Sequence, residues 1–186
     1  MISPNHLALQ EPQRLDPTAF VRSEGDPFTP AICRLQDGTA VRIRPLLFGD
    51  TTALWRFLQG LPSTDTLTAA CLQTSIPLIA VRIGPCGEEE QMIGVGAVVP
   101  MRETCEASGL LLRVTPAFRG LGLGTFLGAR LIGIARRLLA EHLHVQVSEG
   151  DTGMQSVCQR LGFRFTPSAA SGYQEGRLNL HSPAVA

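Results

Sequence analysis

Two spacings of apolar residues run along this chain, one typical of strands and the other typical of helices. Over Ala40–Arg44 apolar and polar residues alternate, which predicts a half-buried strand ended by Pro45 and preceded by the turn residues Asp37 and Gly38. Short apolar runs predict further strands, at residues 78–83, 92–99, 110–114, 143–147, 163–165 and 176–180.

The helical spacing is clearest over Thr125–Glu141, where a stripe of apolar residues recurs and Arg130 falls off it. A helix is expected after Asp50, with Asp50 as its N-cap, and a short one within Ser63–Gln73. Another N-capped helix is expected over Asp151–Leu161.

The coarse order of these elements is β-α-α-β-β-β-α-β-α-β-β, which predicts a mixed α/β or α+β domain. The chain has 186 residues, of which 44% are apolar, enough for one domain with a real core. Residues 1–30 are rich in Pro, Asp, Glu, Gln and Ser without clean periodicity. We expect them to form a loosely ordered arm and residues 31–186 to form the single domain.

Charge and composition exclude several kinds of function. The 16 basic residues balance 16 acidic ones, so no basic face for nucleic acid is expected. All of the basic residues are arginines, which excludes lysine-nucleophile chemistry. The five cysteines form no CxxC pair, and His142 and His144 would point to opposite faces of a helix, so neither a disulfide framework nor a metal site is expected.

Nothing in the sequence predicts a membrane partner. No stretch approaches the ~20 apolar residues that span a bilayer. The first residues carry charge, proline and glutamine where a signal peptide has an apolar run. We therefore expect a soluble, cytoplasmic protein.

A glycine-rich loop leads from the strand that ends at Val114 into the longest helix, with Arg119 followed by glycines at 120, 122 and 124. Glycine lets the backbone approach a ligand closely, and the first N–H groups of a helix have no partners within it. The loop therefore predicts a cradle for a pyrophosphate, with Arg119 placed to pair with it. The alternative is that the glycines serve only a tight turn.

Two common phosphate-binding loops are excluded. The Walker A loop needs Gly-Lys-Ser/Thr, and this chain has no lysine. The dinucleotide fingerprint GxGxxG differs in spacing from Gly120-Leu-Gly-Leu-Gly124, and no run of βαβ units surrounds that segment.

The loop, Arg119-Gly-Leu-Gly-Leu-Gly124, resembles the acyl-CoA motif R/Q-x-x-G-x-G/A of the GNAT superfamily of N-acetyltransferases. A later segment, from Asp151 through Cys158 to Leu-Gly-Phe163, is similar to the family pattern N-x-x-x-x-x-x-Y-x-x-L-G-F. The segment 37–45 resembles the start of bacterial GNAT domains that acetylate protein lysines. Together the resemblance covers about residues 37 to 180.

The resemblance implies the GNAT fold, a mostly antiparallel twisted sheet of about six to seven strands splayed into a V and flanked by about four helices. A bulge in the strand 110–114 would splay it from the strand 143–147, and a backbone N–H there would polarise the thioester of acetyl-CoA. The co-substrate implied is acetyl-CoA, without a metal. The residues implied to hold it are Leu112, Val114, Arg119, Gly120, Leu121, Gly122, Leu123, Gly124 and Thr125.

The implied activity is transfer of an acetyl group from acetyl-CoA to a primary amine, on a protein lysine or a small molecule, by direct attack in a ternary complex. Direct attack needs a base and an acid. The family's glutamate aligns with Gly109, so Glu106 or Glu103 would act through a water, or both are surface carboxylates. The family's tyrosine aligns with Cys158, which would be the acid or a small buried core residue, and Tyr173 is a weaker candidate.

Gly109 and Cys158 also motivate an alternative, a non-catalytic acyl-CoA-binding sensor or regulatory module. Arg113 would favour an anionic group beside the cleft or lie on a solvated strand face. The partners expected are acetyl-CoA or CoA and an amine acceptor, with neither nucleic acid nor membrane. The protein is expected to be a bacterial monomer or homodimer.

Overall fold

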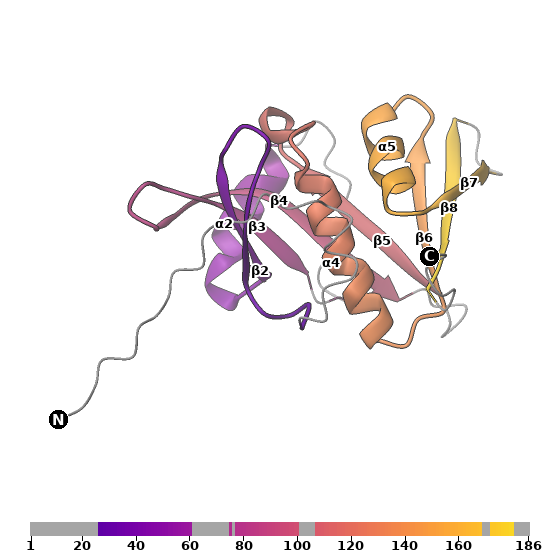
Figure 1. The fold of residues 1–186 in the computed structure, drawn as a ribbon, viewed down its shortest axis with the longest axis horizontal. Helices are drawn as coiled ribbons and strands as arrows, with labels where there is room; N and C mark the ends of the chain where they lie inside the picture. Colours follow the sequence, from indigo (N-terminus) through magenta and orange to yellow (C-terminus); the bar gives the residue numbers. More distant parts are fainter. Residues whose placement is uncertain (1–25, 61–74, 76, 101–106, 169–171, 181–186) are drawn as a thin grey trace.

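The computed structural model of this chain describes residues 26–60, 75, 77–100, 107–168 and 172–180. These residues form an open eight-stranded sheet with helices on both faces (Figure 1). The strands are β1 (Ala31–Arg34), β2 (Ala40–Pro45), β3 (Leu78–Ile83), β4 (Glu89–Pro100), β5 (Ala107–Val114), β6 (His142–Ser148), β7 (Arg164–Pro167) and β8 (Tyr173–Asn179). The helices are α2 (Thr51–Gln59), α4 (Leu123–Arg137) and α5 (Thr152–Arg160), with 3-10 turns η1 (Phe48–Asp50) and η2 (Pro116–Phe118).

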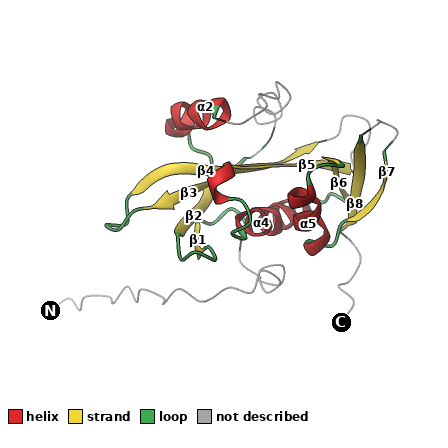
Figure 2. Ribbon diagram, turned by 90° about the horizontal axis from the view of Figure 1, so that it is seen from above, coloured by secondary structure: helices red, strands yellow, loops and turns green. Residues whose placement is uncertain are grey.

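The strands follow one another across the sheet in the order β1-β2-β3-β4-β5-β6-β8-β7. Every neighbouring pair is antiparallel except β5 and β6, which are parallel. Viewed from above, α2 lies on one face of the sheet and α4 and α5 lie on the other (Figure 2). The sheet is therefore covered by helices on both faces (Figure 2), and β5 with β6 is the one parallel pair among the described strands.

Each face of the sheet has its own apolar cluster. On the α4 and α5 face, Leu127 and Leu131 of α4 are buried against strand residues such as Leu143. On the other face, Phe57 and Leu58 of α2 pack with Val95 of β4. This two-sided burial agrees with the near-continuous apolar runs of the central strands.

The mixed α/β architecture predicted from the sequence is confirmed, with eight strands where six to seven were expected. The additional strand is β1, which pairs with β2 as a hairpin around Asp37 and Gly38. Three α-helices lie within the described residues, and the helix expected within Ser63–Gln73 falls outside them. Among the described residues, no helix is long and apolar enough to cross a bilayer.

The helix α4 ends at Arg137, four residues before the predicted end at Glu141. Leu139 has a φ of 58°, in the left-handed region. The amide of Ala140 donates to the carbonyl of Ala135 and that of Leu139 to Arg136, which closes the helix end with a left-handed cap. Apolar residues continue at helical spacing past this cap, and the sequence pattern therefore predicted too long a helix.

Asp50 is the N-cap residue of α2, as predicted, but its side chain makes no capping hydrogen bond to that helix. It has helical backbone angles, and its carboxylate accepts from the guanidinium of Arg44 at 2.6 and 2.9 Å and from the amide of Leu47 at 2.7 Å. Arg44 also pairs with Glu89 at 2.6 Å. The pKa of Asp50 is lowered, chiefly by its hydrogen bonds with Arg44. Asp50 thus ties the start of α2 to strand β2.

Candidate functional site

The parallel strands β5 and β6 stay together for only three residue pairs, the last of them Gly109 with His144. Beyond that pair β5 runs on to Val114 along β4, and β6 runs on to Ser148 along β8. The two strands diverge from this point (Figure 1). One edge of β5, from Leu110 to Val114, is therefore left without a strand partner among the described residues.

The direction of the backbone groups along this edge follows from one hydrogen bond. The amide of Thr115 donates to the carbonyl of Ile93 of β4 at 2.9 Å. Along a strand, the backbone N–H and C=O groups of successive residues point to opposite sides. Those of Thr115 and of every second residue before it therefore point to β4, and those of the residues between them point away. The amides of Leu112 and Val114 therefore point to the open edge. Both residues were predicted from the sequence to hold acetyl-CoA, and the structure places them where an extended ligand can add along the edge.

The backbone carbonyls of Leu112 and Val114 each accept a hydrogen bond from an arginine side chain. Arg113 donates from Nη1 to the Leu112 oxygen at 3.0 Å, and Arg119 donates from Nε to the Val114 oxygen at 3.3 Å. Arg113 is half-buried, so it does not lie on a freely solvated strand face. The expected bulge in this strand is absent, because the pairing of β5 with β4 is regular throughout. Register shifts occur between β3 and β4 instead, and the divergence comes from the change of partners.

The glycine-rich loop joins η2 to α4 and takes backbone conformations that favour glycine. Gly120 has φ 75° and Gly122, the N-cap of α4, has φ 93°. A Cβ atom at either position would meet nothing within 4 Å, so conformation and not crowding requires glycine there. Gly124 differs, because a Cβ there would come within 3.3 Å of Val157 in α5. Gly124 therefore allows α4 to pack against α5.

The loop presents polar groups that have no partner among the described residues. No acceptor is paired with the backbone amides of residues 120–124, at the positive end of the α4 dipole. The hydroxyl of Thr125 is buried and has no hydrogen-bond partner within the same described part. Unpaired donors next to a helix N-terminus fit a pyrophosphate, because its oxygens accept several hydrogen bonds at once.

The β1–β2 hairpin holds this loop in place. The amide of Gln36, in the hairpin turn, donates to the carbonyl of Leu121 at 3.2 Å. Leu121 is half-buried against the core, and Leu123, the first residue of α4, is buried. Arg119 itself is exposed, so its guanidinium can reach an anionic ligand over the loop.

Of the two catalytic candidates from the sequence, Cys158 alone lies within the described residues. Glu106, like Glu103, lies outside the described residues. Cys158 has 0% exposure and belongs to the core cluster, and burial raises the pKa of its thiol to about 12. This placement favours the core role for Cys158 over the acid role. Tyr173 is 45% exposed at the start of β8.

Sequence reasoning missed His144, which belongs to the last residue pair before β5 and β6 part. It considered His142 and His144 on a helix, where they would point to opposite faces, but they lie on β6 and share one face of the sheet. The core residues Leu143 and Val145 alternate with them on the other face. Burial, with Arg177 close by, lowers the pKa of His144 from its ordinary value of 6.5. The signal for this was that the two histidines are two residues apart at a predicted strand, which places their side chains on one face of the sheet.

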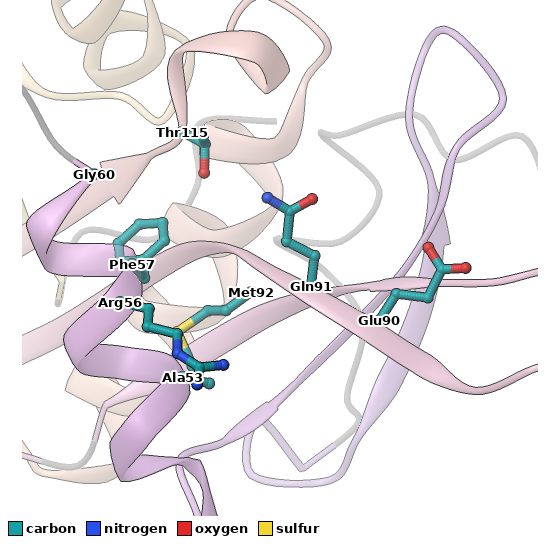
Figure 3. A pocket seen from close by; sticks show the side chains of 8 residues that line it. All are labelled: Ala53, Arg56, Phe57, Gly60, Glu90, Gln91, Met92 and Thr115. Atoms are coloured by element: carbon teal, nitrogen blue, oxygen red, sulfur yellow. The ribbon is translucent and has the colours of Figure 1, made fainter.

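A pocket of about 320 Å³ lies between α2 and β4 on the other face from α4 (Figure 3). Helix α2 contributes Arg56 and Phe57, and the strand contributes Gln91 and Met92. Thr115, directly after β5, also lines the pocket. The described residues contain no group of three or more His, Cys, Asp or Glu placed to hold a metal ion.

Comparison with known proteins gives one family and many similar folds. A model of the acetyltransferase (GNAT) family matches residues 62–163. The GNAT domain of S. lividans PAT is similar in structure, with a TM-score of 0.66, 15% identity, and coverage of 81% of this chain and 96% of that one. No curated protein matches the sequence.

Two of the similar structures contain acetyl-CoA. One is yncA from Salmonella typhimurium with its cofactor acetyl-CoA (TM-score 0.57, 19% identity, 77% of this chain and 96% of that one). The other is a GNAT family acetyltransferase from Elizabethkingia anophelis with acetyl-CoA bound (TM-score 0.58, 19% identity, 75% and 97%). At these identities the likeness establishes a shared fold.

Proposed function

The chain belongs to the acetyltransferase (GNAT) family, and we propose that it is an enzyme that transfers the acetyl group of acetyl-CoA to a primary amine by direct attack in a ternary complex. The observation that carries the proposal is the open edge that β5 has after β5 and β6 part at Gly109 and His144, because β5 then leads into a loop of unpaired amides. The acceptor is a protein lysine or a small-molecule amine.

The residues of the site fit acetyl-CoA in two parts. The amides of residues 120–124, with the hydroxyl of Thr125 and the guanidinium of Arg119, supply donors for the pyrophosphate. The amides of Leu112 and Val114 supply donors along an extended edge, which suits the peptide-like pantetheine arm. When bound, acetyl-CoA supplies the acetyl group as an activated thioester.

Groups of the protein orient the bound acetyl-CoA and polarise its thioester. The open edge of β5 holds the arm in line with the strand, which removes much of the entropy cost of bringing acetyl group and amine together. A backbone amide of the open edge donates a hydrogen bond toward the thioester oxygen as negative charge develops on it. The acceptor approaches from the face of the sheet on which α2 lies (Figure 2). No covalent enzyme intermediate is required.

A second candidate function is an acyl-CoA-binding sensor that does not catalyse transfer. It is favoured by Gly109, which lacks the carboxylate expected at that position, and by the full burial of Cys158. The two functions share the binding site and differ in turnover. A sensor binds acetyl-CoA and leaves its thioester intact in the presence of amines.

The test is release of free CoA thiol from acetyl-CoA by the purified full-length chain, with lysine-containing peptides, polyamines and aminoglycosides as acceptors. Amine-dependent release, with acetylated product identified by mass spectrometry, supports the enzyme. Tight binding of acetyl-CoA without release on any acceptor supports the sensor. Absence of both binding and release rejects both functions.

A further inference from the structure

We infer that His144 is the group that accepts the proton of the acceptor amine, an inference that rests on the proposed acetyl transfer. His144 forms with Gly109 the last pair between β5 and β6, so it stands at the point where the two strands part. The proposed path of the pantetheine arm along the open edge of β5 leads from Val114 back toward this point. The thioester end of the arm is thereby brought to His144.

The imidazole lies on the sheet face toward α2, which is the face from which the acceptor is proposed to approach. His144 alternates along β6 with Leu143 and Val145, whose side chains belong to the core on the α4 side. Its partner on β5 is Gly109, which has no side chain. In neighbouring strands paired residues stand side by side, so the imidazole has no β5 side chain against it at this register. It is half-buried and still accessible.

The surrounding face is polar and carries both signs of charge. Arg177 of β8 stands directly opposite His144, and Glu175 of β8 and His142 of β6 also act electrostatically on its imidazole. Arg164 of β7 pairs with Arg177 one strand further out. From β5, the residue beside His144 is Gly109, which does not titrate. A carboxylate such as Glu175 attracts an ammonium group toward this face.

The protonation state of His144 at neutral pH suits a general base. Burial is the main cause that lowers the pKa of His144, and Arg177 and His142 lower it further, while Glu175 raises it. Since the ordinary value is 6.5, the imidazole is neutral at pH 7 and can accept a proton. The same low pKa makes the imidazolium a competent acid once it has formed.

His144 can both accept the proton and return it, so the reaction needs no second catalytic side chain. An acceptor that arrives as an ammonium group first gives one proton to the solvent. The nitrogen lone pair of the neutral amine then forms the C–N bond to the acetyl carbon, and His144 takes the further proton that the nitrogen loses. The C–S bond breaks and its electron pair leaves with sulfur as the CoA thiolate. His144 then gives its proton to that thiolate, which is more basic (a thiol pKa of about 8.5). The products are the amide and CoA thiol, and His144 is neutral again.

The experiment compares wild type with His144→Gln, using acetyl-CoA and the amine that gives the fastest release in the acceptor screen. His144→Gln is expected to lower kcat about 10²- to 10⁴-fold, the usual contribution of a general base. In wild type, kcat/KM is expected to decrease below pH 6.5, where His144 becomes protonated. This acid limb of the pH profile is expected to be absent in His144→Gln. Binding of acetyl-CoA, measured by calorimetry, is expected to stay within about twofold because the loop is untouched.

The matched control is His142→Gln, which removes an imidazole from the same face two pairs earlier, where the strands are still together. It is expected to keep most of kcat and to move the acid limb to higher pH, since His142 contributes to lowering the pKa of His144. Titration of the His144 imidazole by NMR in wild type, with and without acetyl-CoA, checks its pKa independently of any turnover.

The inference is overturned if His144→Gln folds, binds acetyl-CoA and keeps its rate and acid limb, or if Glu106→Gln loses the acid limb in its place. It is also overturned if NMR gives His144 a pKa above its ordinary value of 6.5. Failure of the proposed function looks different, because wild type then releases no CoA on any amine.

Discussion

Gly109 of β5 and His144 of β6 face each other as the last pair of the one parallel pairing in the described sheet. After this pair each strand keeps its full pairing with its other neighbour, β5 with β4 and β6 with β8. The open edge is thus built into the sheet by a change of partners. A rigid edge of this kind holds a ligand with little loss of entropy on binding, because its donors are already in place.

Gly122→Ala is expected to weaken acetyl-CoA binding about tenfold. An alanine at φ 93° costs about 1–2 kcal/mol, and relief of that strain moves the amides away from the phosphates. The control is Gly87→Ala, at φ 87° in the remote β3–β4 turn with equally open space around it. Calorimetry should show weaker binding for Gly122→Ala alone. Equal affinities in the two variants would contradict the role assigned to the loop.

Cys158→Ala is expected to keep acetyl transfer while losing about 1–2 kcal/mol of stability, the usual range for a change in a packed core. The thiol is fully buried, and its pKa of about 12 makes it a poor proton donor. Thermal unfolding and initial rates of CoA release measure the two effects separately. A large fall in kcat with unchanged acetyl-CoA binding would restore Cys158 to the acid role.

Stability is expected to fall steeply at alkaline pH. Burial raises the pKa of both Cys33 and Cys158 from 9.0 to about 12. Below pH 9 both thiols are protonated in the folded and unfolded states, so their contribution is fully present. Between about pH 9 and 12 only the unfolded state loses these protons, which costs about 1.4 kcal/mol per thiol per pH unit. Urea unfolding of wild type and Cys158→Ala from pH 8 to 10.5 should show a shallower slope in the variant. Identical slopes would contradict the assignment.

Arg130→Met is expected to destabilise the fold by about 2 kcal/mol, because it leaves two carbonyls without their charged donor. The Arg130 guanidinium is buried and donates to the oxygen of Pro27 at 2.6 Å and to that of Thr29. Arg136→Met, at an exposed position of the same helix, is the control and should change stability by less than about 0.5 kcal/mol. Chemical denaturation of both variants measures the difference, and equal stabilities would contradict the anchoring role of Arg130.

The sequence predicted the parts of this fold whose causes are local. Alternation over residues 40–44 and the apolar runs of the central strands gave the strands, and the glycines at 120 and 122 gave the loop that starts α4. The N-cap of α5 was also predictable and is confirmed, because the carboxylate of Asp151 accepts from the amide of Met154 at 2.9 Å.

Features that depend on distant partners were not predictable. Arg130 falls off the apolar stripe of its helix, yet it is buried because its partners, 103 and 101 positions away, fold over it. Asp50 precedes a helix and its side chain would cap it, but Arg44 and Leu47 hold the carboxylate. His144 becomes a site residue only through the strand order, which no local pattern contains.

The central claim is that the loop at the start of α4 binds the pyrophosphate of acetyl-CoA, and calorimetric titration of the full-length chain with acetyl-CoA tests it most directly. Wild type should bind, and Arg119→Glu should bind at least about tenfold more weakly, since charge-assisted hydrogen bonds contribute about 1.5–3 kcal/mol. Arg136→Glu, the same charge change at the other end of α4, should bind as wild type does. Absence of binding in wild type, or equal affinity of the two variants, would contradict the account.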